Sequence, residues 1–153
     1  MMGRLMILSM RSEEPITLFI NSQGGHVESG DTIHDMIRFI DSRVRIVGTG
    51  WVGSAAALIY VSVPIEDRFC LPNTRFLWHQ PAGGVQGSSS DISIEAEQIM
   101  QIRNRTNKIF ARQTGQAFEK IQEDSKRNFW LNASSAKNYG IVGHIVKHID
   151  EVR

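Results

Sequence analysis

Apolar residues recur along the chain with two different spacings, which predict an alternation of strands and helices. Runs rich in β-branched and aromatic residues predict strands at 16–20, 44–48, 68–71 and 75–78. Between the first two runs, residues 29–40 place apolar side chains at helical spacing: Ile33, Met36, Ile37 and Ile40. A strand–helix–strand order of this kind predicts an α/β domain with right-handed crossovers.

The same spacing predicts further helices. The first residues, MMGRLMILSMRSEE, are interpreted as the end of an amphipathic helix, and others are expected at 54–61, 91–114, 117–124 and 132–140. Gly115 and Gly140 are the expected ends of two of these helices, since glycine adopts the left-handed conformation that often terminates a helix. Asn132 is the expected N-cap of the last one.

Composition narrows the class of protein without naming a function. The 153 residues are enough for one domain with its own core, taken to span positions 1–153. A net charge of +1 gives no support to a nucleic-acid partner, and no apolar run is long enough to cross a membrane. The single cysteine, Cys70, excludes an internal disulfide and suits a reducing compartment, so the cytoplasm is expected. The cations of the 91–114 helix are interpreted as a solvated face: Arg103, Arg105, Lys108 and Arg112.

A serine stands where the second strand gives way to a small-residue helix, in the stretch GTGWVGSAAALIYV. Ser54 at this position has two interpretations. Its hydroxyl caps the helix, which is a common use of serine, or it is a nucleophile in the positive potential of the helix N-terminus. The stretch is not the G-x-S-x-G elbow of α/β-hydrolases, because Ala56 replaces the second glycine.

A nucleophilic serine requires a base, and His79 is the best placed histidine. In FLWHQPAGG it lies at the end of a strand, just before a loop, where α/β sheets commonly place functional residues. A structural hydrogen-bonding role fits its position equally well. His26 is a weaker candidate, His34 lies within a helix, and exposure is expected for the remaining two, His144 and His148. No metal or cofactor motif is present, so no cofactor is expected.

Two adjacent glycines, Gly24 and Gly25, follow the first strand in INSQGGHVESG. A turn alone would need one glycine. Two therefore predict a place where another group comes close to the main chain.

Five stretches together resemble the ClpP family, the proteolytic subunits of the Clp protease: LFINSQGGHVESGDTIHDMI, VGSAAAL, RFCLPNTRFLWHQPAGGVQGSSSDI, TGQAFEKI and NASSAKNYGIV. They cover nearly the whole chain in order. The resemblance implies a crotonase-like α/β fold with repeated strand–helix units and a serine protease with Ser54 as nucleophile and His79 as base. It also implies an oxyanion hole made of the Gly25 and Ala55 N–H groups. A crotonase-fold acyl-CoA enzyme is a distant alternative.

The resemblance also implies an assembly of homo-heptameric rings stacked in pairs, which degrades unfolded polypeptides delivered by an AAA+ unfoldase of the Clp type. A strand in GGVQGSSSD, residues 83–91, and the helix from Asp91 would form a protruding handle where the rings meet. Phe19, Phe39 and Phe69 fall where the family docks its ATPase. The family's axial N-terminal loop, first helix and first strand have no counterpart here.

The chain departs from the family pattern at the acid of the triad, where Asn128 stands in place of aspartate. An amide can accept the imidazole N–H but cannot offset the charge of the imidazolium, so weak or conditional activity is expected. The alternative acid, Asp124, would need a shift of one helical turn.

A second departure lies at the ring contact. Lys126 precedes Arg127, where family members carry an acid that pairs between rings. Two adjacent cations that face their symmetry mates would repel. Two hypotheses follow: a serine endopeptidase made competent by assembly, or a catalytically poor structural or regulatory subunit of a ring mixed with a paralogous ClpP.

Overall fold

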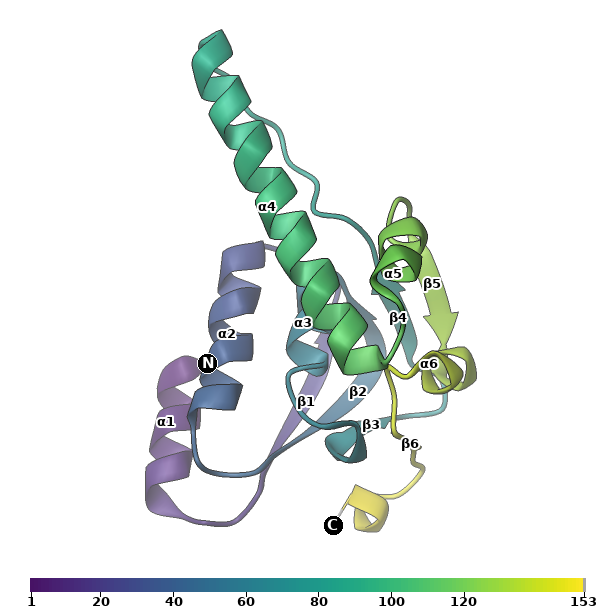
Figure 1. The fold of residues 1–153 in the computed structure, drawn as a ribbon. Coiled ribbons are helices and arrows are strands. Elements are labelled where there is room, and N and C mark those ends of the chain that lie inside the picture. The colour runs from purple at the N-terminus through teal and green to yellow at the C-terminus, as the bar shows by residue number, and fades with distance from the viewer. Residues whose placement is uncertain (153) are drawn as a thin grey trace.

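The structure is a computed structural model that describes residues 1–152. Its helices, in chain order, are α1 (Met2–Arg11), α2 (Val27–Phe39), α3 (Ala55–Tyr60), α4 (Ser89–Thr114), α5 (Phe118–Asp124) and α6 (Ala133–Tyr139), with the 3-10 turns η1 (Ile65–Asp67) and η2 (Ile149–Val152). Its strands are β1 (Ile16–Ser22), β2 (Val44–Gly53), β3 (Arg68–Cys70), β4 (Arg75–Trp78), β5 (Phe129–Asn132) and β6 (His144–Ile145). Figure 1 shows the sheet in the body of the molecule and α4 reaching beyond it.

One sheet is organised around the long strand β2. On one edge β2 pairs with β1, and on the other it pairs first with β3 and then with β4, all in parallel. The short strand β6 continues the sheet beside β3, and β5 pairs antiparallel with β4. The predicted α/β class and its parallel crossovers are confirmed.

The main core lies between the sheet and its helices. Every residue of α3 is buried, because its three alanines allow it to pack close to its neighbours. Gly30 of α2 contacts this helix so closely that a Cβ at Gly30 would lie 3.0 Å from that of Ala55. The C-terminal half of α4 also joins the core, where Trp78 stacks on Phe110 with ring centres 4.0 Å apart.

The strands alternate between this core and a second face of the sheet. Phe76 and Trp78 of β4 are buried in the main core, whereas Arg75 and Leu77 point the other way. The second face is covered at its β3–β6 end by a smaller apolar cluster that includes η2: Val47, Phe69, Val146 and Val152. At the β4–β5 end, Arg75 and Trp130 are exposed.

Most predicted elements are confirmed, but β2 is longer than predicted. It continues past the expected end at Gly48, because Gly50 adopts a left-handed φ of 57° and the strand resumes beyond it. The Asn21 side chain stabilises this bulge by accepting a hydrogen bond from the Trp51 N–H at 3.1 Å. The strand β5 was not predicted.

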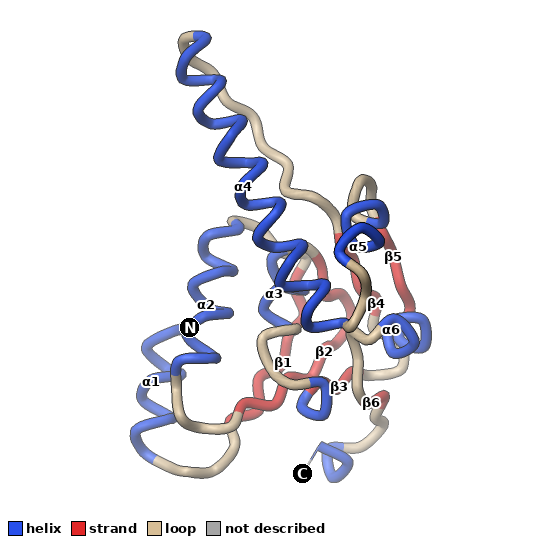
Figure 2. Tube along the Cα trace, viewed as in Figure 1, coloured by secondary structure: helices blue, strands red, loops and turns tan. Residues whose placement is uncertain are grey.

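The expected handle strand at 83–91 is not a strand in this structure. Residues 79–88 are loop, and the helix begins at Ser89 (Figure 2). An extended segment forms a strand only when a neighbouring backbone pairs with it, and none of the described residues does so here. The helix start is fixed by a capping box in which Ser88 and Asp91 bond each other's backbone N–H.

The structure bears on two features expected from composition, the state of the single cysteine and the absence of a membrane-spanning segment. Cys70 is a free, buried thiol, and burial raises its pKa to about 12, so it is an inert core residue. Among residues 1–152, no helix has the length and apolar character needed to span a membrane.

Candidate active site

Ser54 occupies a strained elbow between β2 and α3. Its φ of 54° and ψ of −123° make it the one non-glycine residue with positive φ in the described part of the chain. Such a conformation costs on the order of 1–3 kcal/mol and is typical of functional positions. The elbow is held by the Ser54 N–H, which donates to the Leu77 carbonyl at 2.9 Å. Ser54 is the N-cap residue of α3, as one interpretation predicted, but its side chain makes no capping hydrogen bond, so its hydroxyl is not engaged by the helix.

The two adjacent glycines serve different purposes. Gly24 has a φ of 97°, and a Cβ there would lie 2.6 Å from the Gly53 carbonyl oxygen and 2.7 Å from the Ser54 Cβ. Its bare backbone is therefore what allows the β1–α2 loop to lie against the serine elbow. Gly25 has a φ of 153° and no atom within 4 Å of a Cβ position, so it opens onto free space beside the serine.

Two main-chain donors lie beside this space. Neither the Gly25 N–H nor the Ala55 N–H donates a hydrogen bond to another described residue. Both residues line cavities that also involve the serine elbow. Unpaired donors next to a reactive hydroxyl are what an oxyanion hole requires.

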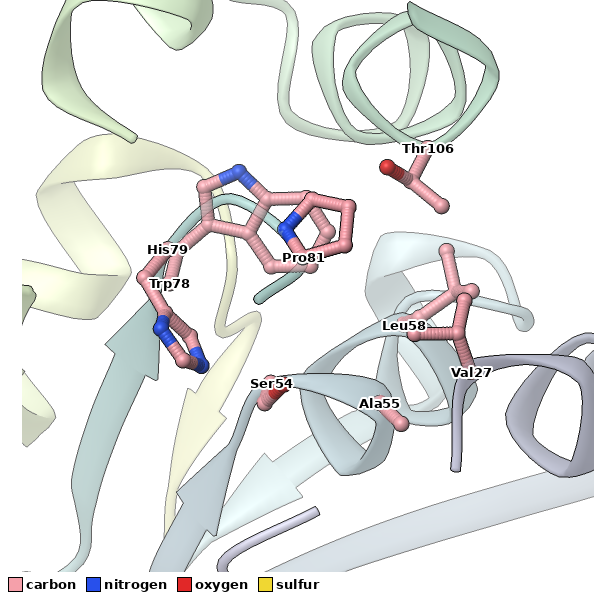
Figure 3. Close-up of a pocket in the computed structure, with 8 residues that line it drawn as sticks. All are labelled: Val27, Ser54, Ala55, Leu58, Trp78, His79, Pro81 and Thr106. Atoms are coloured by element: carbon pink, nitrogen blue, oxygen red, sulfur yellow. The ribbon is translucent and has the colours of Figure 1, made fainter. Parts of the chain in front are cut away.

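His79 follows the last residue of β4 and faces the same opening. Figure 3 shows its ring pointing towards Ser54 from the end of the strand. Partial burial lowers the pKa of His79 below its usual value, because desolvation disfavours the charged ring. The ring is therefore neutral at neutral pH, as a general base must be. The two side chains share a cleft without a direct hydrogen bond between them, and such contacts often tighten only when substrate binds.

Asn128 directly precedes β5 and lines the same cleft. Ser54, His79 and Asn128, which are far apart in sequence, all line one cleft of about 430 Å³. Parallel pairing of β2 with β4 and antiparallel pairing of β4 with β5 bring their three chain segments to one end of the sheet.

Asp124, the alternative acid, is engaged elsewhere. Its carboxylate accepts a hydrogen bond from the Tyr139 hydroxyl at 2.6 Å and from Lys120 Nζ at 2.7 Å. Burial raises the pKa of Asp124, but these two bonds outweigh that effect and hold the pKa below its usual value. The carboxylate thus joins α5 to α6, and nothing in its contacts supports a role beside His79.

A second, smaller cavity is also lined by Ser54 and His79. It has a volume of about 20 Å³ and is bounded by residues of α2, α3, β4, α4 and the loop after β4: Val27, Leu58, Trp78, Pro81 and Thr106 (Figure 3). A space of this size holds about one water molecule, so the room for a substrate beside the hydroxyl lies in the larger cleft.

The other histidines do not join this group. His144 and His148 are exposed as expected, and His26 is an exposed residue near Glu28. His34 is buried on α2, where its Nδ1 lies 2.9 Å from the Asp35 carboxylate.

Two tryptophans that sequence reasoning missed line the same cleft. Trp51 of β2 and Trp130 of β5 have ring centres 5.4 Å apart, and the Arg75 guanidinium lies 4.9 Å from the Trp130 ring centre. The available signal was the spacing of Trp130 two residues after Asn128, which places both on one face of a strand. Without a predicted strand there, that signal could not be used.

The residues predicted for contacts between subunits differ in exposure. Phe19 and Phe39 are 58% and 75% exposed, whereas Phe69 is 7% exposed and packs in the second-face cluster. Phe69 therefore lacks the exposure that a docking residue needs. Lys126 and Arg127 are exposed, and Lys126 Nζ lies 2.5 Å from the Glu123 carboxylate of its own chain.

The fold and the cleft define an α/β protein in which a serine and a histidine share one cleft, as they do in serine hydrolases. A family model described as Clp protease matches residues 1–149. The chain is 54% identical to the ATP-dependent Clp protease proteolytic subunit 2 of Gluconobacter oxydans, over 99% of the chain and 69% of that protein. It is 52% identical to proteolytic subunit 2 of Pseudomonas aeruginosa, over 94% of the chain and 71% of that protein.

Solved structures agree with these relatives. ClpP1 from Listeria monocytogenes matches with a TM-score of 0.90 and 51% identity, covering 99% of this chain and 85% of that one. An asparagine-to-aspartate mutant of that ClpP1 matches with a TM-score of 0.93 at the same identity and coverage. The chain therefore belongs to the Clp protease family. It is a proteolytic subunit of the ClpP type, and its relatives imply a serine peptidase rather than an acyl-CoA enzyme.

Proposed function

We propose that the chain is a serine endopeptidase subunit that hydrolyses unfolded polypeptides, with Ser54 as nucleophile, His79 as general base and Asn128 as the partner of the imidazole. The observation that carries this proposal is the convergence of these three side chains on one cleft beside two unpaired main-chain N–H groups. The free hydroxyl and strained backbone of Ser54 support it.

The proposed reaction follows from these positions. His79 takes the proton of the Ser54 hydroxyl as Oγ attacks the carbonyl carbon of the peptide bond. The Gly25 and Ala55 N–H groups donate hydrogen bonds to the oxyanion that forms, each contributing about 3–4 kcal/mol to transition-state stabilisation. His79 then gives its proton to the leaving amine, and water hydrolyses the acyl-enzyme by the same steps.

Asn128 makes this activity weak or conditional. Its amide oxygen can accept the Nδ1–H of His79 and fix the tautomer of the ring, but a neutral amide does not stabilise the imidazolium as a carboxylate does. In a trypsin-like protease the same exchange of aspartate for asparagine lowers the rate by about 10⁴, largely through the wrong tautomer.

Assembly into stacked heptameric rings, served by an AAA+ unfoldase of the Clp type in the cytoplasm, belongs to the same proposal. Exposed Phe19 and Phe39 support a docking surface for the unfoldase. The Lys126–Glu123 ion pair offsets part of the charge at the ring contact, although an exposed pair is worth at most about 1 kcal/mol. Native mass spectrometry tests the repulsion: single rings at modest salt are expected for the chain alone, and stable double rings would contradict it.

The second candidate is a structural or regulatory subunit of a mixed ring, which the Asn128 and Lys126 substitutions favour. A fluorophosphonate probe separates the two. Labelling of the isolated chain supports the enzyme, and labelling only after a paralogous ClpP chain is added supports a conditional enzyme. No labelling under either condition would support the silent subunit.

A further inference from the structure

Trp51 and Trp130 form one wall of the catalytic cleft, and the fold leaves part of this wall exposed. Trp130 is 41% exposed although it is the largest kind of apolar side chain, and the cleft that it lines also contains Ser54 and His79. We propose that this wall is a substrate subsite that takes an aromatic or large aliphatic side chain of the polypeptide and disfavours lysine and arginine. The inference rests on the proposed function, because it assigns a specificity to the same cleft.

The wall is continuous with the nucleophile. Trp51 and Trp130 lie on the two strands that flank β4 and on the same sheet face, since Trp51 pairs with Arg75 and Trp130 pairs with Leu77. The Trp51 indole packs over Gly53, where an added Cβ would lie 2.7 Å from Nε1. Gly53 directly precedes Ser54, so a side chain that contacts the wall belongs to a residue close to the bond under attack.

The wall is also fixed in place before substrate arrives. The main chain of Trp51 is held by the Asn21 side chain, and the two indoles contact each other. The Arg75 guanidinium covers the Trp130 ring as a cation–π pair. A rigid apolar surface loses little conformational freedom on binding, which favours its use as an anchor.

The charges around the wall set the preference against cations. None of the residues that line the cleft is Asp, Glu, Lys or Arg, because the triad acid is replaced by Asn128. A fixed charge at the wall itself is the Arg75 cation over Trp130. A lysine of the substrate would therefore lose its hydration, find no carboxylate and meet a like charge.

Binding is measured first, in the Ser54→Ala chain, so that its result does not depend on catalysis. Labelled peptides carry phenylalanine, norleucine, alanine or lysine at one position, moved step by step along the sequence, and fluorescence anisotropy gives each Kd. Norleucine has the four-carbon chain of lysine without the ammonium group, so the ratio of their Kd values reports the effect of that charged group. At one position, the phenylalanine and norleucine peptides should bind about tenfold or more tightly than the lysine peptide.

Variants at the wall test whether Trp130 and Arg75 cause that preference. Adding Trp130→Ala to the Ser54→Ala chain should weaken binding of the phenylalanine peptide about tenfold and that of the alanine peptide less than about twofold. Trp130→Phe should retain most of the preference, and Arg75→Gln should narrow the gap between norleucine and lysine. Met10→Ala, at an exposed apolar residue of α1, is the control and should change nothing.

Equal weakening of all peptides by Trp130→Ala would show a structural role and overturn the subsite, as would a panel without preference or without binding. The proposed function is tested separately by fluorophosphonate labelling of the chain with Ser54 intact. A peptide preference without labelling of Ser54 would retain the subsite and refute the endopeptidase. Labelling of Ser54 without a peptide preference would retain the endopeptidase and refute the subsite.

Discussion

The two ends of the second sheet face differ in exposure: one is buried and the other is open. At the β3–β6 end, Phe69 and Val47 are buried with Val146 and Val152 in a cluster that includes η2. At the β4–β5 end, Trp51 and Trp130 line an open cleft that leads to Ser54. The covered end contributes the free energy of apolar burial to folding. At the open end part of this free energy is not gained, because the apolar surface stays exposed, where a polypeptide can contact it.

The largest expected effect is at the open end. Ser54→Ala should lower the peptidase rate about 10⁴-fold or more, because the hydroxyl is the proposed nucleophile. The midpoint of thermal unfolding should hardly change, since the Ser54 side chain makes neither a capping hydrogen bond nor any other to a described residue. Hydrolysis of a fluorogenic peptide and a thermal melt check both parts. More than about one hundredth of the original rate would refute the assignment.

At the covered end, the expected effect is on stability. Phe69→Ala should lower the free energy of unfolding by about 3–5 kcal/mol, because it leaves a cavity in a buried cluster. The matched control is Trp130→Ala at the open end, where a partly exposed side chain should cost about 1 kcal/mol. Urea unfolding measures both, and equal losses would abolish the distinction between the two ends.

The difference between the buried and the open end of the second sheet face could be predicted only in part from the sequence. Long periodic segments such as the α4 pattern were predicted well, as were the ends of two helices at Gly115 and Gly140, both of which are left-handed. The site residues Ser54 and His79 were found as candidates, because each follows a strand. Neither the resemblance nor the spacing revealed the Trp51–Trp130 wall, which depends on pairing between strands distant in the chain.

Two errors have the same physical origin. The handle segment at 83–91 has no paired neighbouring backbone among residues 1–152, so its sequence alone could not decide whether it is a strand. The four residues of β5 are too few to show a clear alternation, and they become a strand through pairing with β4. Tertiary pairing decides short strands more than local propensity does.

A smaller effect is expected from restoring the acid at the open end. Asn128→Asp should raise the peptidase rate at least about tenfold, because a carboxylate stabilises the imidazolium of His79. Asn132→Asp makes the same chemical change at the other end of β5, where the side chain caps α6, and should leave the rate unchanged. If both variants behave alike, the amide at position 128 does not limit the reaction.

The smallest expected effect is on the pH profile. Burial lowers the pKa of His79, so the neutral base is present, and kcat/KM should reach half its plateau below pH 6.5. The rate should rise with pH through that value, because protonation removes the base. In Asn128→Asp the carboxylate favours the protonated ring, and the acid limb should move up by about one pH unit. An unchanged limb would mean that position 128 does not contact His79.

The central claim is that the Ser54 hydroxyl owes its reactivity to the imidazole of His79. Mass spectrometry of the chain treated with a fluorophosphonate, with and without a paralogous ClpP chain, identifies the modified residue and its rate of labelling. The phosphonate should be found on Ser54 in the unaltered chain and should be lost in His79→Ala. Modification at the same rate in both proteins, or at another serine, would contradict the account.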